Sequence, residues 1–408
     1  MRKPLSKALS IVWTVMTSSA IAAHELPKQP MLRRGDVLIP ASSLERAEDV
    51  GRGLRAHTNH MILVTPEMDA AARDTFVGTK PYGETPATIR SAYKMPSSGG
   101  AGAIAIVDAY DDPTAESDLD TFSATFGLPA CTTANGCFHK MYASGKRPAV
   151  DCGWAQEISL DIEWAHALAP EAKIVLVEAA SNSSTDLFRA VDLASTTVNT
   201  RSIGFGEVSM SWGFSEFAGE QTFDTHFHQA DVVYFASSGD VGGQRIYPGV
   251  SPDVVSVGGT TIHRDAAGHF LSETAWSDSG GGPSAYESRP AFQDVIVTIV
   301  GSHRGAPDAA FDADPHSGVA IYDSTACQGV SGWLTFGGTS LSAPATAGVV
   351  NLAGHFYHSS EIELSTMYSN RGTANFRDIL TGTAGSFTAR KGWDFVTGIG
   401  TSLGVAGK

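Results

Sequence analysis

The stretch GWAQEISLDIEWAHALAPEAKIVLVEA, residues 153–179, combines the two patterns that decide the fold. Apolar residues recur at helical spacing over 154–168, and a continuous apolar run of strand type follows at 173–179. Apolar strands joined by helices form right-handed βαβ units, so this alternation predicts an α/β fold with a mostly parallel central sheet and helices on both faces. Further strands are expected at 103–109, 208–211 and 232–237, and further helices at 86–93, 116–126, 185–197 and 215–229.

The composition of the 408-residue chain is typical of a compact, turn-rich α/β protein. Hydrophobic residues make up 42% of the chain and charged residues 17%, so a large core can form. The formal net charge of −15 would repel a phosphate backbone, which disfavours nucleic acid as a partner. We expect a monomer with one domain over residues 79–408, preceded by a short prosegment or N-terminal extension over 24–78.

The N-terminus has the features of a signal peptide over residues 1–23. Arg2, Lys3 and Lys7 precede an uncharged stretch that ends in small residues, and the letters AIA at 20–22 satisfy the small-x-small cleavage pattern. We therefore expect cleavage after residue 22 or 23 and a secreted, extracellular protein without a membrane anchor, although a periplasmic location is equally compatible. An uncleaved anchor is the alternative.

Four cysteines are consistent with export, because an even number can pair without remainder. Cys131 and Cys137 bracket the short polar loop TTANG and are expected to join each other, which leaves Cys152 for Cys327. Four cysteines allow three connectivities, so this pairing is a hypothesis. None lies in a CxxC pattern, which argues against zinc or dithiol redox chemistry.

A candidate nucleophile lies in GGTSLSAPATAGVVNLAGHF, residues 337–356. Two glycines and Thr339 form a tight turn that delivers Ser340 at the start of a helix rich in small residues and nearly free of charge. A serine at the N-terminus of a buried helix gains amide donors and the positive end of the helix dipole, which stabilise an oxyanion. A plain N-cap serine is the alternative, but the longer G-T-S-x-S-x-P string resembles the nucleophile string of subtilisin-like serine peptidases.

A serine nucleophile needs a base, and none of the 13 histidines has the H-G-T-H context of subtilisin-like enzymes. Asp108, at the end of the strand over 103–109, would lack a histidine partner. Glu157 and Asp161 are four residues apart, which puts both carboxyls on one helical face. Two carboxylates in contact can share one proton, so one can accept the serine proton while the other orients it. A solvated acidic helix face is the alternative.

A third acid follows the strand over 232–237, in the string SSGD. Subtilisin-like enzymes place there an asparagine that hydrogen-bonds the oxyanion, and Asp240 can donate such a bond only when it is protonated. A turn former is the alternative for a lone aspartate after glycine. An oxyanion donor of this kind would restrict activity to acid pH.

These motifs resemble the sedolisin (serine-carboxyl) peptidase family, relatives of subtilisin in which glutamate replaces histidine as the base. The resemblance covers about residues 82–404, including TPATIRSAY, AIAIVDAYDDP, the E-x-x-x-D helix, SMSWG (209–213), SSGD and GGTSLSAP. It implies a subtilisin-like α/β fold and a serine-type endopeptidase with Ser340 as nucleophile, Glu157 as base, Asp161 as its partner and Asp240 as oxyanion donor. Polypeptide substrates would pair their backbone with SMSWG, beside the loop WSDSGGGPS (276–284).

The resemblance also implies one structural calcium ion near the C-terminus. Carboxylates of Asp378 and Asp394, with carbonyl oxygens of Ile379, Arg390 and Gly392, would provide the hard oxygen shell that Ca²⁺ prefers. Binding there would stabilise the C-terminal loop rather than act in the chemistry. An ordinary surface loop is the alternative.

The N-terminal extension is the main departure from this family, whose members are usually made with a long folded prodomain. Residues 24–78 are either a shortened prosegment or a segment not needed for folding, and we assign the histidines of HTNH (57–60) to a loop. Three functions compete with the serine-carboxyl peptidase: a histidine-dependent subtilisin using Asp108, an inactive relative acting as a secreted binding protein, and a calcium-stabilised adhesion module. The intact set of four catalytic residues favours the peptidase.

Overall fold

The computed structural model describes residue 1 and residues 30–71, 76–200 and 205–408. The predicted signal peptide over 1–23 and its cleavage motif lie, apart from Met1, outside these described residues. Among the described residues, no helix is both long and apolar enough to cross a membrane.

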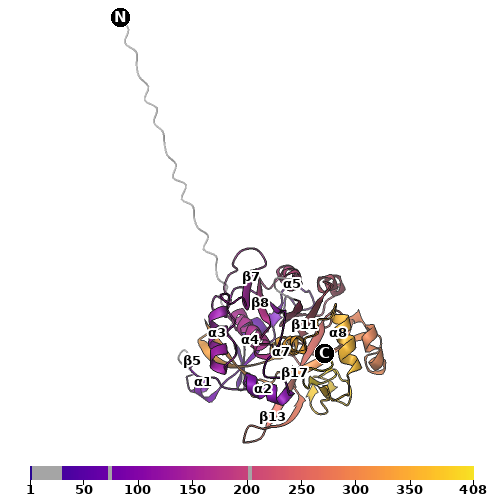
Figure 1. The fold of residues 1–408 in the computed structure, drawn as a ribbon. Coiled ribbons are helices and arrows are strands. Elements are labelled where there is room, and N and C mark those ends of the chain that lie inside the picture. Colours follow the sequence, from indigo (N-terminus) through magenta and orange to yellow (C-terminus); the bar gives the residue numbers. More distant parts are fainter. Residues whose placement is uncertain (2–29, 72–75, 201–204) are drawn as a thin grey trace.

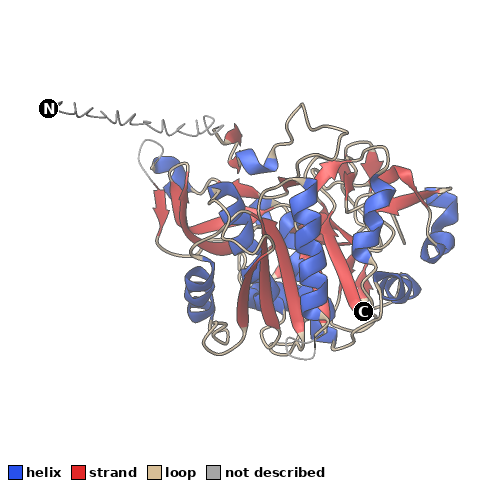
Figure 2. Ribbon diagram, turned by 90° about the horizontal axis from the view of Figure 1, so that it is seen from above, coloured by secondary structure: helices blue, strands red, loops and turns tan. Residues whose placement is uncertain are grey.

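A ten-stranded sheet runs through the middle of the molecule, with helices in front of and behind its strands (Figures 1 and 2). Neighbouring strands are parallel except at two places, where β14 pairs with β13 and β20 pairs with β23. The predicted subtilisin-like α/β fold with a mostly parallel sheet is confirmed. In spatial order the strands are β20 (Phe376–Arg377), β23 (Thr401–Ser402), β17 (Ala309–Asp312), β13 (Val255–Arg264), β11 (Val232–Ser237), β9 (Gly206–Met210), β6 (Ala103–Ala109), β8 (Lys173–Ala179) and β7 (Phe138–Tyr142), with β14 (Phe270–Ala275) on β13.

Helices cover both faces of this sheet, because the side chains of each strand alternate between two cores. Ile104 and Ile106 of β6 pack in one core with α4 (Cys152–Leu168) and α7 (Thr339–Ala353), which contact each other. Ala105 and Val107 pack in the opposite core with α5 (Ser184–Val198). The helices that carry Glu157 and Ser340 therefore lie side by side on one face. The other helices are α1 (Pro66–Ala70), α2 (Pro86–Tyr93), α3 (Ala115–Phe126), α6 (Val297–Val300) and α8 (Ser360–Ser369), with 3₁₀ helices η1 (Ala41–Ser43), η2 (Glu220–Phe227), η3 (Ala291–Ile296) and η4 (Pro315–Ser317).

Most predicted elements agree with the structure to within two residues at either end, but the helix expected over 215–229 is wrong. Strand β10 (Trp212–Ser215) ends at the first residue of that segment, and the 3₁₀ helix η2 occupies its middle. Gly219 separates the two in the left-handed region, with φ 90°. A right-handed helix cannot continue through such a residue, so the apolar spacing alone was misleading here.

The extension over 24–78, for which the sequence predicted no regular structure, is built into the same body over its described part. Strands β1 (Leu32–Arg34), β2 (Val37–Ile39) and β4 (Met61–Leu63) form a sheet with β19 (Val330–Gly337) and β18 (Val319–Cys327), and β5 (Phe76–Gly78) pairs with β19. A second small sheet has the order β12 (Ile246–Tyr247), β10 and β3 (His57–Thr58). Two hairpin-like pairs complete the structure: β15 (Gly282–Ser288) with β16 (His303–Ala306), and β21 (Thr383–Ala384) with β22 (Phe387–Thr388).

Both disulfides have the predicted connectivity. Cys131 and Cys137 are joined, with Cα atoms 4.8 Å apart. Cys152 and Cys327 are joined, with Cα atoms 5.1 Å apart, and this bond ties the first residue of α4 to the last residue of β18. The longer connection therefore anchors the helix that carries Glu157.

Candidate active site

Ser340 lies in the first turn of α7, directly after β19. Gly338 makes the turn between them with φ 106° and ψ 160°, a conformation that is essentially restricted to glycine. The Ser340 hydroxyl donates to the carbonyl oxygen of Ser211 at 3.1 Å and accepts from the amide of Asn59 at 3.0 Å. The amide of Ser340 donates to the carbonyl oxygen of Asn59 at 2.9 Å. Both polar groups of the serine thus contact a residue of the N-terminal extension.

Glu157 and Asp161 lie one turn apart on α4, and neither side chain has exposed surface. The Ser211 hydroxyl lies 2.9 Å from Asp161 Oδ1 and 3.1 Å from the carbonyl oxygen of Ser340. This hydroxyl connects the acidic helix to the serine helix, a role that the string SMSWG did not reveal. Glu157 Oε1 has no hydrogen-bond partner among the described residues. The structure therefore brings the two predicted acids and the predicted nucleophile into one buried cluster.

The pKa values of both acids are raised well above their ordinary range. Burial raises the pKa of Glu157, and the adjacent Ser340 hydroxyl opposes part of this change. Burial is also the largest cause of the raised pKa of Asp161, and the charge of Glu157 adds to it. Two carboxyls that interact this strongly titrate as one unit and can hold a shared proton.

Asp240 approaches the serine turn from the loop after β11. Its Oδ1 accepts from the amide and the hydroxyl of Thr339, each at 2.7 Å, whereas Oδ2 has no partner in the described part of the chain. Burial raises the pKa of Asp240 well above its usual value, although the Thr339 bonds oppose the rise. A Cβ on Gly338 would lie 2.5 Å from Asp240 Oδ2 and 2.2 Å from the carbonyl oxygen of Asn59. The unpartnered Oδ2 of Asp240 and the carbonyl oxygen of Asn59, which the Ser340 amide binds, therefore both lie against Gly338.

Asp108 and His60 extend this buried cluster around Glu157. Both carboxylate oxygens of Asp108 lack a hydrogen-bond partner within the described ranges, and burial, together with the charges of Asp161 and Glu157, raises its pKa. His60 Nδ1 lies 2.5 Å from Glu157 Oε2, and its ring stacks on Phe336. Burial lowers the pKa of His60 to about 3, so its ring is neutral above that pH. The one histidine in the cluster thus contacts the glutamate rather than Asp108, an arrangement unlike a histidine-dependent subtilisin.

Residues 57–63 run across these groups as two short strands, β3 and β4, joined by Asn59 and His60, so the loop assigned to HTNH is wrong for His57 and Thr58. Thr58 pairs antiparallel with Trp212, and His57 with Gly213. Ile62 then pairs antiparallel with Phe336 on the other side of the serine. The apolar letters MILV at 61–64 were an available strand signal, but a sequence pattern does not tell which strand is the partner.

The two strings that the resemblance assigned to a substrate cleft both border this strand. SMSWG supplies the last two residues of β9 and the first two of β10, and the backbone of β10 pairs with β3. The loop over 276–284 hydrogen-bonds to the loop of Asp240, because the amide of Gly280 donates to the carbonyl oxygen of Gly239 at 2.7 Å. Trp276 and Asp278 of the same loop line a cavity together with Met61. Both strings therefore border the extended segment that crosses Ser340.

The candidate calcium ligands lie on two segments that the backbone holds together. Asp378 accepts from the amide of Gly392, at 2.9 Å for its Oδ2, and Asp394 Oδ2 accepts from the amide of Arg390 at 2.9 Å. Asp394 and Ile379 are buried, whereas the side chain of Arg390 is exposed. Carboxylate oxygens keep a second lone pair when they accept one amide, so the donor set remains compatible with a hard cation.

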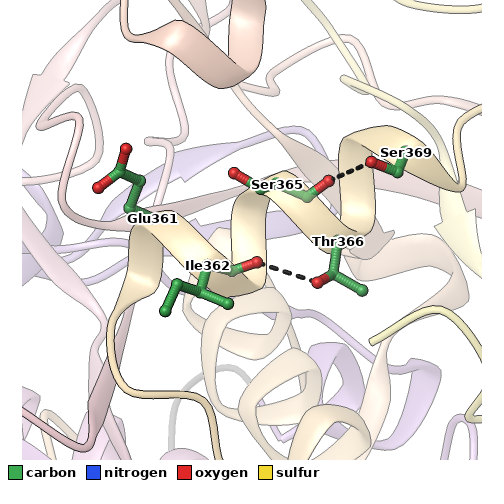
Figure 3. Close-up of a pocket in the computed structure, with 5 residues that line it drawn as sticks. All are labelled: Glu361, Ile362, Ser365, Thr366 and Ser369. Atoms are coloured by element: carbon green, nitrogen blue, oxygen red, sulfur yellow. Dashed lines mark hydrogen bonds between the residues drawn. The ribbon is translucent and has the colours of Figure 1, made fainter.

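A hollow over α8 shares no residue with the catalytic cluster (Figure 3). Its polar contacts run within the helix, from Thr366 Oγ1 to the carbonyl oxygen of Ile362 (3.0 Å) and from Ser369 Oγ to that of Ser365 (2.7 Å). Glu361 is the only acid in its lining. This surface offers no pair of groups for acid–base catalysis.

Comparison with known proteins points to serine-carboxyl peptidases. No protein-family model matches the chain. The chain is 33% identical to sedolisin of Pseudomonas sp. (strain 101) over 177 residues, which cover 39% of this chain and 29% of that protein. It is 29% identical to kumamolisin of Bacillus sp. (strain MN-32) over 415 aligned positions, covering 91% of this chain and 71% of that protein. A tripeptidyl-peptidase of Arthroderma otae is 31% identical over 38% of this chain and 30% of that protein.

Solved structures share the fold. Pseudomonas sedolisin, a serine-carboxyl proteinase complexed with two molecules of pseudo-iodotyrostatin, superimposes with a TM-score of 0.65 at 22% identity, over 79% of this chain and 96% of that one. A psychrophilic S41 protease superimposes with a TM-score of 0.52 at 18% identity, over 79% of this chain and 99% of that one. At these identities the likeness establishes the fold alone.

Proposed function

We propose that the chain is a member of the sedolisin family of serine-carboxyl peptidases, and that it is a secreted, monomeric endopeptidase that cuts polypeptides in acid through an acyl-enzyme. One observation carries the proposal. An extended backbone lies between Ser340 and Asp240, with the Ser340 amide bound to one of its carbonyl oxygens and Glu157 beside the serine hydroxyl. This is the placement that acyl transfer to a serine requires.

In the proposed reaction, Ser340 Oγ attacks the carbonyl carbon of the scissile bond while Glu157 takes its proton. Asp161 holds the proton shared by the pair, which leaves Glu157 able to accept another. The oxyanion is bound by the Ser340 amide and by protonated Asp240. Glu157 then gives its proton to the leaving amine, and water repeats the sequence on the ester.

The acid dependence follows from the same groups. As the pH rises through the raised pKa of Asp240, its carboxyl ionises and can no longer donate to the oxyanion. As the pH falls far enough to protonate both members of the Glu157–Asp161 pair, no base remains. Activity should therefore follow a bell-shaped curve with its maximum in acid.

Cleavage of an acid-unfolded protein by the purified chain, measured from about pH 3 to about pH 8, tests the function. We expect cleavage in acid, none at the alkaline end, and none at any pH for Ser340→Ala. Strong cleavage at about pH 8 with none at about pH 4 would contradict the carboxyl mechanism. Binding of polypeptides without cleavage at any pH would instead identify a non-catalytic binding protein.

We also propose that the C-terminal loop binds one structural calcium ion, held by Asp378 and Asp394 with carbonyl oxygens of Ile379, Arg390 and Gly392. The support is the oxygen donor set, which two amide–carboxylate bonds hold together. The ion would link two segments near the C-terminus and take no part in the chemistry.

Calcium should raise the melting temperature of the Ser340→Ala chain, and a chelator should lower it. Binding to the folded state alone adds about 2.7 kcal/mol when calcium is about 100-fold above its Kd. Asp378→Asn should lose most of this difference, since it removes one ligand charge, whereas Asp265→Asn, in the turn between β13 and β14, should keep it. Identical melting curves with calcium and with chelator would rule out the site.

A further inference from the structure

The turn that carries Asp240 is pinned at both ends by main-chain bonds to one neighbouring loop. Before Asp240, the carbonyl oxygen of Gly239 accepts from the amide of Gly280 at 2.7 Å. After it, the amide of Gly243 donates to the carbonyl oxygen of Ser279 at 3.1 Å. Any shift of the residues between these two anchors must therefore be taken up within the turn itself.

The place of Asp240 inside this turn is set within narrow limits. Its Oδ1 accepts from both the amide and the hydroxyl of Thr339, each at 2.7 Å, and Thr339 directly precedes Ser340. A displacement of about 1 Å in a positioned group can cost about a hundredfold in rate. The next residue, Val241, is 60% exposed, so its side chain adds little packing that would hold the turn. Another element must therefore hold the outer side of the turn.

The tip of the β21–β22 hairpin contacts that outer side. Gly385 opens the two-residue turn of the hairpin and has φ 55°. A Cβ on Gly385 would lie 2.3 Å from the carbonyl oxygen of Gly242 and 3.2 Å from the Cα of Gly243. A Cβ on Gly242 would lie 2.8 Å from the amide nitrogen of Gly385 and 2.5 Å from the carbonyl oxygen of Ser277. Gly242 is thus enclosed between the hairpin and the loop of Ser277, and neither glycine has room for a side-chain atom.

The hairpin is anchored at its base. Ala384 is buried in a small core together with Ile379 and Val396. The amide of Ala275, the last residue of β14, donates to the carbonyl oxygen of Thr381 at 2.8 Å. The base of the hairpin is therefore joined to the central sheet, and its tip is a fixed surface against which the neighbouring turn rests.

We propose that Gly385 is a positioning residue for Asp240, an inference that rests on the proposed peptidase function. The backbone of the hairpin tip blocks movement of Gly242, and because the turn is pinned on either side, it thereby keeps Asp240 against Thr339. Gly385 contacts no substrate and transfers no proton. It acts on the reaction through the place of the oxyanion donor alone, and the lack of a side chain is what permits the contact.

A short peptide aldehyde, selected for inhibition of the parent enzyme, tests the proposal. Ser340 Oγ adds reversibly to the aldehyde carbon, and the oxygen of the tetrahedral adduct takes the place of the oxyanion in the reaction. We expect Gly385→Ala to raise the inhibition constant of the aldehyde by about tenfold or more and to lower kcat, whereas KM for a peptide substrate should stay the same. An inhibition constant does not depend on the fraction of active enzyme, so partial misfolding would not imitate this result.

Gly127→Ala is the matched control. Gly127 ends α3 with φ 67°, and a Cβ there would have no atom within 4 Å, so the change adds similar backbone strain without a contact. This control should bind the aldehyde like the parent.

A double-mutant cycle with Asp240→Ala separates positioning from a general effect on the fold. Once the carboxyl of Asp240 is gone, Gly385→Ala has no donor left to displace, so it should change the inhibition constant by less than about twofold in that background. Phe387→Ala is a second variant that does not depend on Gly385→Ala folding. It removes a ring that lies 3.4 Å from a Cβ built on Gly243, and its effect on the inhibition constant should likewise require Asp240.

The outcomes separate this proposal from the proposed function. If the parent digests an acid-unfolded protein but Gly385→Ala and Phe387→Ala bind the aldehyde as tightly as the parent, positioning is overturned and the peptidase function stands. The same conclusion follows if the loss in Gly385→Ala persists in the Asp240→Ala background or is shared by Gly127→Ala. If the parent cuts no polypeptide at any pH, the function itself fails and the positioning role fails with it.

Discussion

Glu157→Gln should lower kcat/KM for an acid-unfolded protein by about a thousandfold or more, because it removes the proposed base beside the Ser340 hydroxyl. Glutamine has nearly the shape of glutamate but cannot accept the hydroxyl proton of Ser340. It can still fill the buried position beside His60, so the loss should lie mainly in kcat. Steady-state kinetics on enzyme whose N-terminus has been confirmed by mass spectrometry would check this expectation.

Glu163→Gln is a matched control for this variant. Glu163 lies on the same helix, is equally buried, and also has one carboxylate oxygen without a partner among the described residues. Its other oxygen accepts from the amide of Tyr322 at 3.0 Å, away from Ser340. Activity should be unchanged. Comparable losses in the two variants would show that helix α4 is sensitive to any change, and full activity of Glu157→Gln would mean that another group is the base.

The folded chain should be more stable at about pH 4 than at about pH 8, by about 3 kcal/mol or more. Burial raises the pKa of Glu178 to about 8, and the same cause raises that of Glu363 to about 8, from a model value of 4.5 in each case. Because these folded-state pKa values exceed the unfolded ones, the folded chain binds more protons between those limits. The stabilisation is complete below about pH 4.5 and is lost as the pH rises toward 8. One pKa unit corresponds to about 1.4 kcal/mol, so even one unit on each group accounts for the expected difference.

Denaturant unfolding at the two pH values measures this difference, in a Ser340→Ala background that prevents self-digestion. Glu363→Gln should reduce the difference, because both oxygens of Glu363 lack a hydrogen-bond partner in the described structure and only its ionisation is removed. Glu361→Gln, two residues earlier on α8 and exposed, should leave it unchanged. Equal stability at both pH values, or a larger value at about pH 8, would overturn the prediction.

The sequence predicts the residues that form the candidate site, but it does not predict which segment of the chain lies beside them. The i, i+4 spacing of Glu157 and Asp161 determines that both carboxyls share a helical face, because spacing along a helix is a local property. The string around Ser340 likewise determines a turn followed by a buried helix. No local pattern indicates that Asn59 meets Ser340, a contact between residues 281 positions apart. The same limit applies to Ser211, whose hydroxyl joins two helices distant in sequence.

The sequence by itself determined the α/β alternation and the residue types able to perform acid–base and nucleophilic chemistry, and it favoured the pairing of the two cysteines that bracket a short loop. These follow from periodicity, loop length and side-chain chemistry, which are properties of neighbouring residues. Only the tertiary structure decided that residues 57–63 lie beside Ser340, that the acids are buried enough to shift their pKa values, and that Asp240 lies against the turn that carries Ser340. Strand pairing and desolvation depend on which distant segments meet, and that choice is made by the packing of the whole chain.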